Sequence, residues 1–278
     1  MAPRKALKAE KGARKDLKKI EENRNENRAK SKAESRCSPQ LFITEMKKLD
    51  ERITPQQRDA VMRTPFSHFL QCSPNYNNAA LMESIVDKYN DDIVGFAVGK
   101  GVTLSFPSTE LSCVLGLRDA GVHVHPGLKK VPTVVRRFFD GKLGNVNRTT
   151  IIKVLHQIAG NEEWAAGERD IEDFARVFIL FLFNTILFPT AHKYVPPYII
   201  HYVDDLESID EYAWGEAVHA FLVNSLKKRA EGRTYVDGCT FGLVVRSYLN
   251  VLSILYCYIL LCAEPYYINV LKTSILNC

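Results

Sequence analysis

Residues 170–189 read DIEDFARVFILFLFNTILFP, and the apolar run inside this stretch decides the fold. From Val177 to Phe188 a helix would be apolar nearly all round, which is typical of a helix at the centre of a core or of a membrane span. These twelve residues are too few to cross a bilayer, so the sequence predicts a central core helix. Asp170 is expected to cap this helix at its N-terminus, and Pro189 is expected to end it.

Helical spacing of apolar residues also occurs on both sides of this stretch. Helices are expected within residues 38–63, 78–89, 150–159 and 211–229, the last with Trp214 on its apolar face. The chain lacks the regular alternation of strands and helices that builds a large parallel sheet. The sequence therefore predicts a mainly α, multi-helix globular domain.

The periodicity changes near residues 93–106, where one small β-hairpin is expected. Two short apolar runs, 93–98 and 102–106, flank Gly99–Lys100–Gly101, and a glycine-bearing link between β-prone runs is typical of a hairpin. A short helix should follow from Pro107 and end at Gly116, because glycine readily adopts the left-handed conformation that ends helices.

The basic charge of the chain is concentrated at its N-terminus. Residues 1–36 carry 13 Lys and Arg against 6 Asp and Glu, whereas the remaining chain carries 24 against 26. This segment has few large apolar residues, so a disordered arm is expected. Two interpretations stay open, a solubilising tail or a nuclear-import and nucleic-acid-binding arm. The second interpretation would use Arg4, Lys5, Arg14, Lys15, Lys18 and Lys19.

The C-terminal segment, residues 249–278, is an atypical apolar tail. From Val251 onward only Glu264 and Lys272 are charged. We expect this tail to come from a misplaced exon boundary or from a truncated transposon, which transcript sequencing would test. A membrane anchor through residues 241–263 is the alternative, although Arg246 and Asn250 interrupt that span.

The cysteine pattern indicates a reduced compartment. The seven cysteines are scattered, lack CxxC spacing and follow a charged N-terminus without an apolar leader. Most are therefore expected to be buried as small apolar residues rather than paired in disulfides.

Two nucleotide- and cofactor-binding patterns fail on inspection. Gly95 to Gly101 resembles a phosphate-binding loop, but the glycine spacing is one residue short and Gly101 replaces the required Ser or Thr. Pyridoxal-phosphate chemistry needs a glycine- and serine-rich phosphate cup before a lysine, and the chain has none. No cofactor is expected.

Side chains that could form other sites are explained more simply. His219, Asp237 and Cys239 could be assembled into a cysteine-protease site, but a buried packing cysteine is expected instead. His123 and His125 could bind a metal, yet no second ligand pair lies nearby, so no metal is expected. Asp204–Asp205 is expected to cap a helix or to pair with an arginine.

Two blocks of sequence resemble the plant mobile domain family. The first runs from Phe96 to Gly121, and the second combines 178–188, 203–218 and the Gly238–Cys239 pair that precedes a helix. The motif residues are Gly99, Leu115, Gly116, Leu117, Asp205, Tyr212, Trp214, Gly215, Gly238 and Cys239. The resemblance assigns residues 37–248 to this domain, between the arm (1–36) and the tail (249–278).

The resemblance implies a transposon-derived plant protein of the MAIN-like type, located in the nucleus and linked to meristem maintenance and silencing. Relatives are often described as aminotransferase-like, an activity that the residues above argue against. We expect a non-catalytic module that binds a protein or a nucleic acid rather than a small molecule or a membrane. The alternatives are a truncated transposon relic without a host function and a divergent enzyme with an unrecognised site.

Overall fold

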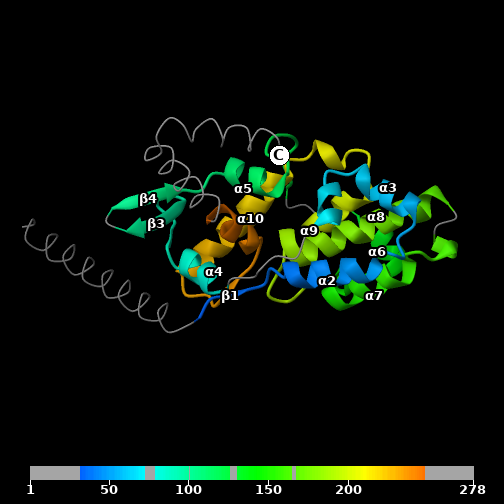
Figure 1. Ribbon diagram of the computed structural model, residues 1–278, viewed down its shortest axis with the longest axis horizontal. Coiled ribbons are helices and arrows are strands. Elements are labelled where there is room, and N and C mark those ends of the chain that lie inside the picture. Colours follow the sequence, from blue (N-terminus) through cyan, green and yellow to red (C-terminus); the bar gives the residue numbers. More distant parts are fainter. Residues whose placement is uncertain (1–31, 73–78, 100, 126–129, 165–166, 248–278) are drawn as a thin grey trace, which may run out of the picture.

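A computed structural model describes residues 32–72, 79–99, 101–125, 130–164 and 167–247 (Figure 1). Helices dominate these ranges and one small antiparallel sheet accompanies them, which confirms the predicted fold class. The predicted tail lies outside the described residues. So does the predicted arm up to residue 31, including its six candidate basic residues.

The central helix is the apolar stretch that the sequence singles out. Helix α8 (Glu168–Leu182) continues directly into a π-helix, η4 (Phe183–Leu187), and residues 177–188 are all buried. The helix ends before Pro189, as predicted. The prediction that Asp170 caps it is wrong, because Gly167 occupies the N-cap position and Asp170 lies in the first turn. Asp170 instead pairs with an arginine of another helix.

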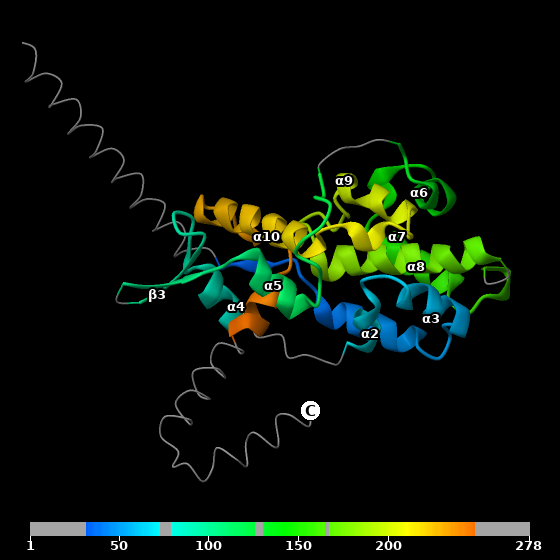
Figure 2. The ribbon, with the colours of Figure 1, turned by 90° about the horizontal axis from the view of Figure 1, so that it is seen from above.

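Helices pack around α8 on two sides, which explains why it has no polar face along its second half. Figure 2 shows α2 (Pro39–Leu49) and α3 (Pro55–Met62) on one side and α6 (Thr133–Phe138) and α7 (Arg148–Ile158) on the other. The ring of Phe42 in α2 stacks on the ring of Phe181 in α8, with the two ring centroids 5.3 Å apart.

Helix α3 begins with a capping box, a signal carried by Thr54 and Gln57. Thr54 accepts a hydrogen bond from the backbone N–H of Gln57, and the side chain of Gln57 accepts one from Thr54. The amide of Gln57 also donates to the carbonyl of Ile158 at 2.9 Å, which ties α3 to the end of α7. A local sequence signal thus also fixes a contact between distant helices.

The other end of the molecule is built on α10 (Trp214–Ala230). Helix α5 (Ser108–Leu115) packs across α10, and α4 (Ala79–Val86) lies on the same end of the molecule (Figure 1). Gly215 permits the close approach of α5, because a Cβ at this position would lie 2.0 Å from Ser112 Oγ. A further helix over residues 240–247 begins just after Cys239.

The predicted hairpin projects from this end of the molecule (Figures 1 and 2). Its strands are β3 (Gly95–Gly99) and β4 (Val102–Ser105), and β2 (Tyr89–Asn90) pairs with β3 as a third strand. Gly101 has φ +79°, the left-handed conformation that the tight link requires. The structure therefore confirms the hairpin and adds a strand that the sequence did not predict.

Several short elements complete the fold. Strands β1 (Glu34–Ser35) and β5 (Tyr235–Val236) form a parallel pair, so the last residues of the predicted arm contact the body. The segment between residues 120 and 147 contains α6 as well as loops. The remaining short helices are η1 (Ser67–Gln71), η2 (Leu143–Asn145), η3 (Glu162–Trp164), α9 (Pro197–Ile200), η5 (His201–Asp204) and η6 (Ile209–Glu211).

Within the described ranges, no helix has the length and apolar character that a membrane crossing requires. The predicted alternative of an anchor through residues 241–263 falls mostly on residues outside these ranges.

Candidate interaction site

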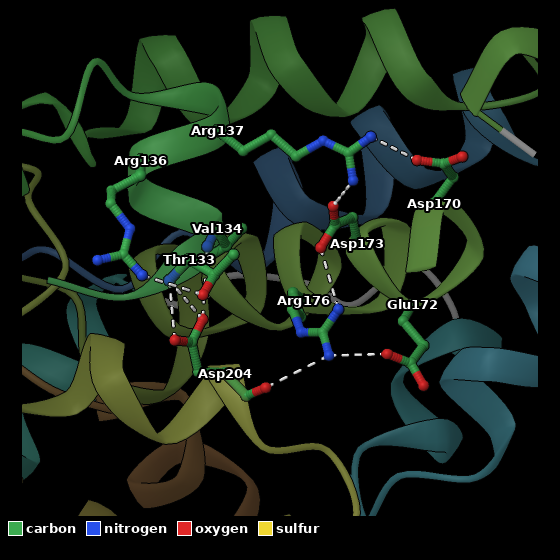
Figure 3. A network of polar contacts seen from close by, with 9 residues as sticks. All are labelled: Thr133, Val134, Arg136, Arg137, Asp170, Glu172, Asp173, Arg176 and Asp204. Atoms are coloured by element: carbon green, nitrogen blue, oxygen red, sulfur yellow. Dashed lines mark hydrogen bonds and ion pairs between the residues drawn. The ribbon is translucent and has the colours of Figure 1, made fainter. Parts of the chain in front are cut away.

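Arg137 of α6 reaches two carboxylates of α8. Its guanidinium pairs with Asp170 and with Asp173, which lie one helical turn apart (Figure 3). The guanidinium carbon also lies 4.7 Å from the ring centroid of Trp164, which is a cation–π contact. Burial alone would lower the pKa of Arg137, but the two carboxylates outweigh burial and raise it. Arg137 thus stays charged and fastens α6 to α8.

Arg176 continues this network along α8. It donates to Asp173 at 3.0 Å, to Glu172 at 2.8 Å and to the backbone carbonyl of Asp204 at 3.3 Å (Figure 3). Asp173 is only 2% exposed, and it is neutralised by two arginines. A buried carboxylate with two cationic partners avoids the large cost of an unpaired buried charge.

Asp204 closes the network at the start of α6. Both oxygens of its carboxylate lie 2.8 Å from the backbone nitrogen of Thr133, and one also accepts from Val134 at 3.4 Å. Asp205 accepts from the hydroxyl and backbone of Ser208, and this hydroxyl lowers the pKa of Asp205. The predicted capping role thus holds for Asp204, whereas Asp205 forms a turn with Ser208 ahead of η6.

An acidic groove borders this network on the side of α3. We use this name for a hollow of about 400 Å³ between α3, the start of α8 and the segment after η5. Its polar lining includes four carboxylates but only one guanidinium. The lining residues are Ala60, Arg63, Thr64, Glu168, Glu172, Leu206, Glu207 and Asp210.

The charged groups of the network are paired with one another, whereas several of those in the groove are exposed. Within the network, the charged groups of Arg137, Asp173 and Arg176 neutralise one another and hold helices together. In the groove, the side chains of Glu168 and Glu207 are exposed. Such a surface suits Lys or Arg side chains of a partner and repels phosphates.

The glycine and tryptophan motif residues serve packing. Trp214 is fully buried, and its indole N–H donates to the carbonyl of Ile209 at 2.6 Å. Gly116 ends α5 with φ +61° under the ring of His68. At Gly238, φ is +88° and a Cβ would lie 3.0 Å from the backbone of Leu222.

The other motif residues also lie within the fold. Gly99 pairs with Val102 at the end of the hairpin. Leu115, Leu117 and Cys239 are buried, and Tyr212 packs edge-on against Trp214.

The structure keeps His219, Asp237 and Cys239 in separate contacts. The imidazole of His219 lies 2.7 Å from the carbonyl oxygen of Phe106, and burial lowers the pKa of this histidine. Asp237 pairs with Arg233 at 3.0 Å. The thiol of Cys239 faces another cysteine, so these contacts support the packing interpretation over a protease site.

His123 and His125 lie side by side, with ring centroids 6.0 Å apart. His123 Nδ1 is 2.6 Å from a carboxylate oxygen of Glu216. Across the described part of the chain, no three or more His, Cys, Asp and Glu side chains gather as a metal site would require.

Sequence reasoning missed Arg137 and the buried role of Asp173. One signal was available, because Asp170, Asp173 and Arg176 recur at three-residue spacing and so share a face of α8. Their partner on α6 could not be identified, since that helix was itself not predicted.

These features define the class of the protein, a helical domain whose buried charges hold its elements together. The chain belongs to the family described as Domain of unknown function (DUF8566), which matches residues 35–244. This range runs from β1 to the helix over residues 240–247.

A particular relative follows from a second comparison. Over 210 residues the chain is 26% identical to Protein MAINTENANCE OF MERISTEMS of Arabidopsis thaliana, covering 72% of this chain and 43% of that protein. The chain thus spans less than half the length of this curated relative. The match fits the MAIN-like resemblance in the sequence, whereas the wider plant mobile domain assignment stays a prediction. No solved structure matches the chain.

Proposed function

We propose that this chain is a non-catalytic, transposon-derived nuclear module that acts in meristem maintenance by binding a protein partner. The observation that carries the proposal is the extent of the similarity to Protein MAINTENANCE OF MERISTEMS. The alignment covers 72% of this chain, so the similarity is not confined to one motif.

The charge of the body favours a protein over a nucleic acid as its partner. The acidic groove presents Glu168, Glu207 and Asp210, whose charges oppose a phosphate backbone and suit a Lys- and Arg-rich segment. In this proposal the basic residues of the N-terminal arm supply nuclear import, and the body supplies the choice of partner.

Imaging and complementation in Arabidopsis test the location and the role. A fluorescent fusion of the full chain should be nuclear, and deletion of residues 1–31 should redistribute it to the cytoplasm. The full chain should also restore at least part of meristem function in plants that lack Protein MAINTENANCE OF MERISTEMS. A reticular or membrane signal that the deletion leaves unchanged would contradict the nuclear assignment.

A peptide-binding measurement tests the proposed class of partner. Fluorescence polarisation with a Lys- and Arg-rich 12-residue peptide should show binding that weakens as salt rises. The combined substitution Glu168→Gln, Glu207→Gln and Asp210→Asn should weaken it at least tenfold. Substituting Glu51, Asp59 and Glu231, which are exposed acids outside the groove, by their amides is the matched control. Equal losses in both variants, or tighter binding to a 20-base-pair DNA duplex, would overturn the groove's role.

A further inference from the structure

Two cysteines that lie 202 positions apart in the sequence are brought together by the β1–β5 pair. Ser35 pairs with Val236, and the N–H of Arg36 donates to the carbonyl of Val236 at 3.1 Å. Cys37 lies two residues after the end of β1. Cys239 comes three residues after the β5 partner, immediately before the helix over residues 240–247.

The β1–β5 pair and the start of the helix over residues 240–247 bring the two thiols into the same part of the interior, where both residues are buried. Each thiol shifts the pKa of the other. Cys37 Sγ also lies 3.6 Å from the carbonyl oxygen of Ile186. Close by, Ser35 Oγ and Thr240 Oγ1 are 2.5 Å apart, which fixes the strand against the start of the helix.

The surroundings give the two thiols different acidities. Burial alone would raise the pKa of Cys37. The side chains of Cys239 and Thr240, the backbone of Phe241 and the positive charge of Arg148 together lower this pKa overall. The side chain of Cys37 and burial together raise the pKa of Cys239. Cys37 is thus the more acidic thiol of the two, and the more acidic thiol of a pair is the one that a peroxide oxidises first.

We propose that Cys37 and Cys239 form a redox-modification site, in which hydrogen peroxide converts the two thiols into an intramolecular disulfide. The Cys37 thiolate attacks a peroxide oxygen, the O–O bond breaks, and a sulfenic acid and hydroxide form. The hydroxide takes the proton of Cys239. The Cys239 thiolate then attacks the sulfenic sulfur and displaces a second hydroxide, which is protonated from solvent. The two sulfurs lose two electrons, and the peroxide gains them as it becomes two waters.

Burial determines how fast this site reacts. Only two residues on each strand form the β1–β5 pair, so local opening at this point is easier than unfolding of the α8 core. Peroxide reaches Cys37 in the opened state, and reclosure brings Cys239 onto the sulfenic acid. The resulting bond fixes the base of the N-terminal arm to the helix over residues 240–247.

The test uses the full chain and maps its thiols by mass spectrometry. The reduced protein is treated with hydrogen peroxide, blocked with N-ethylmaleimide and digested. We expect a peptide pair linked through Cys37 and Cys239 that disappears on reduction. The oxidised chain should unfold at a temperature roughly 10 °C higher, because the bond closes a very long loop.

Variants separate this pair from general thiol oxidation. Cys113→Ser removes an exposed cysteine and should leave the linked peptide and the thermal shift unchanged. Cys239→Ser should abolish both and leave Cys37 as a sulfenic or sulfinic acid. The proposal is overturned if wild-type Cys37 and Cys239 both remain alkylated under peroxide that oxidises Cys113. It also fails if Cys37 is overoxidised while Cys239 stays a free thiol.

Discussion

Large apolar side chains are buried around α8, but several are exposed at the β-hairpin. Around α8 the large apolar side chains are buried and stack in pairs, as Phe42 and Phe181 do. At the hairpin, Val102 is 55% exposed and Leu104 is also exposed. The hairpin still buries Phe96 and Phe106, but its exposed apolar residues should be replaceable at little cost, whereas those around α8 should not.

The largest expected effect comes from opening a cavity in the helical half. Phe181→Ala should lower the free energy of unfolding by about 4 kcal/mol, because a fully buried ring that stacks on Phe42 is lost. Val102→Ala at the hairpin is the matched control and should change it by less than ~0.5 kcal/mol. Urea denaturation followed by circular dichroism measures both, and equal losses would remove the contrast between the two regions.

A buried charge provides the next test. Asp173→Asn keeps the size of the side chain but removes the charge shared by Arg137 and Arg176, and it should cost about 3 kcal/mol. The same change at its more exposed neighbour, Glu172→Gln, should cost less than ~1 kcal/mol. Thermal unfolding of the two variants should rank them in this order. An Asp173→Asn variant as stable as the wild type would show that the network contributes nothing.

The hairpin end contains a residue whose replacement should stabilise the protein. Val94 has φ +43°, a conformation that a β-branched residue rarely adopts, and its side chain is partly exposed. Val94→Asn should raise the free energy of unfolding by about 1 kcal/mol, since asparagine tolerates this conformation better. Ile93→Asn, one residue earlier, should not stabilise. A loss of stability in Val94→Asn would mean that contacts of the valine outweigh its strain.

The smallest effect depends on pH. Glu45 accepts from Lys48 and lies 2.7 Å from the imidazole of His156; burial opposes its ionisation, but these contacts lower its pKa below 4.5. Because the folded-state pKa is the lower one, its contribution is present above the unfolded pKa and is lost as pH falls through the folded value.

Glu45→Gln should therefore be about 1 kcal/mol less stable than the wild type at pH 7. The difference should shrink as pH falls below about 4.5. Denaturant titrations at several pH values between 3 and 7 measure this, and a gap that widens toward acid pH would refute the sign.

Elements with strong local signals could be predicted from the sequence. The apolar run of α8, the capping box at Thr54 and the glycine that ends α5 at Gly116 each act through a few neighbouring residues. The hairpin also carries its signal locally, in the glycines around its turn. The motif residues were identified from the resemblance to the plant mobile domain family, and most of them serve packing.

Elements held by distant partners could not be predicted. Helix α6 lies in a segment rich in glycine and proline, and it depends on Asp204 at its start and on the pairing of Arg137 with α8. Strands β1 and β5 have two residues each, which is too short to show periodicity, and their paired residues lie 201 positions apart. The acidic groove could not be predicted either, because its carboxylates come from segments that are distant in the sequence.

The β1–β5 pair also determines how this domain can be combined with others. The family match begins at residue 35 and ends at 244, and the strands next to these limits are hydrogen-bonded neighbours. A domain whose two borders meet can be inserted into a loop of a longer protein without separating the ends of that loop. Such an arrangement would let the domain lie within a longer protein, and the aligned part makes up only 43% of Protein MAINTENANCE OF MERISTEMS.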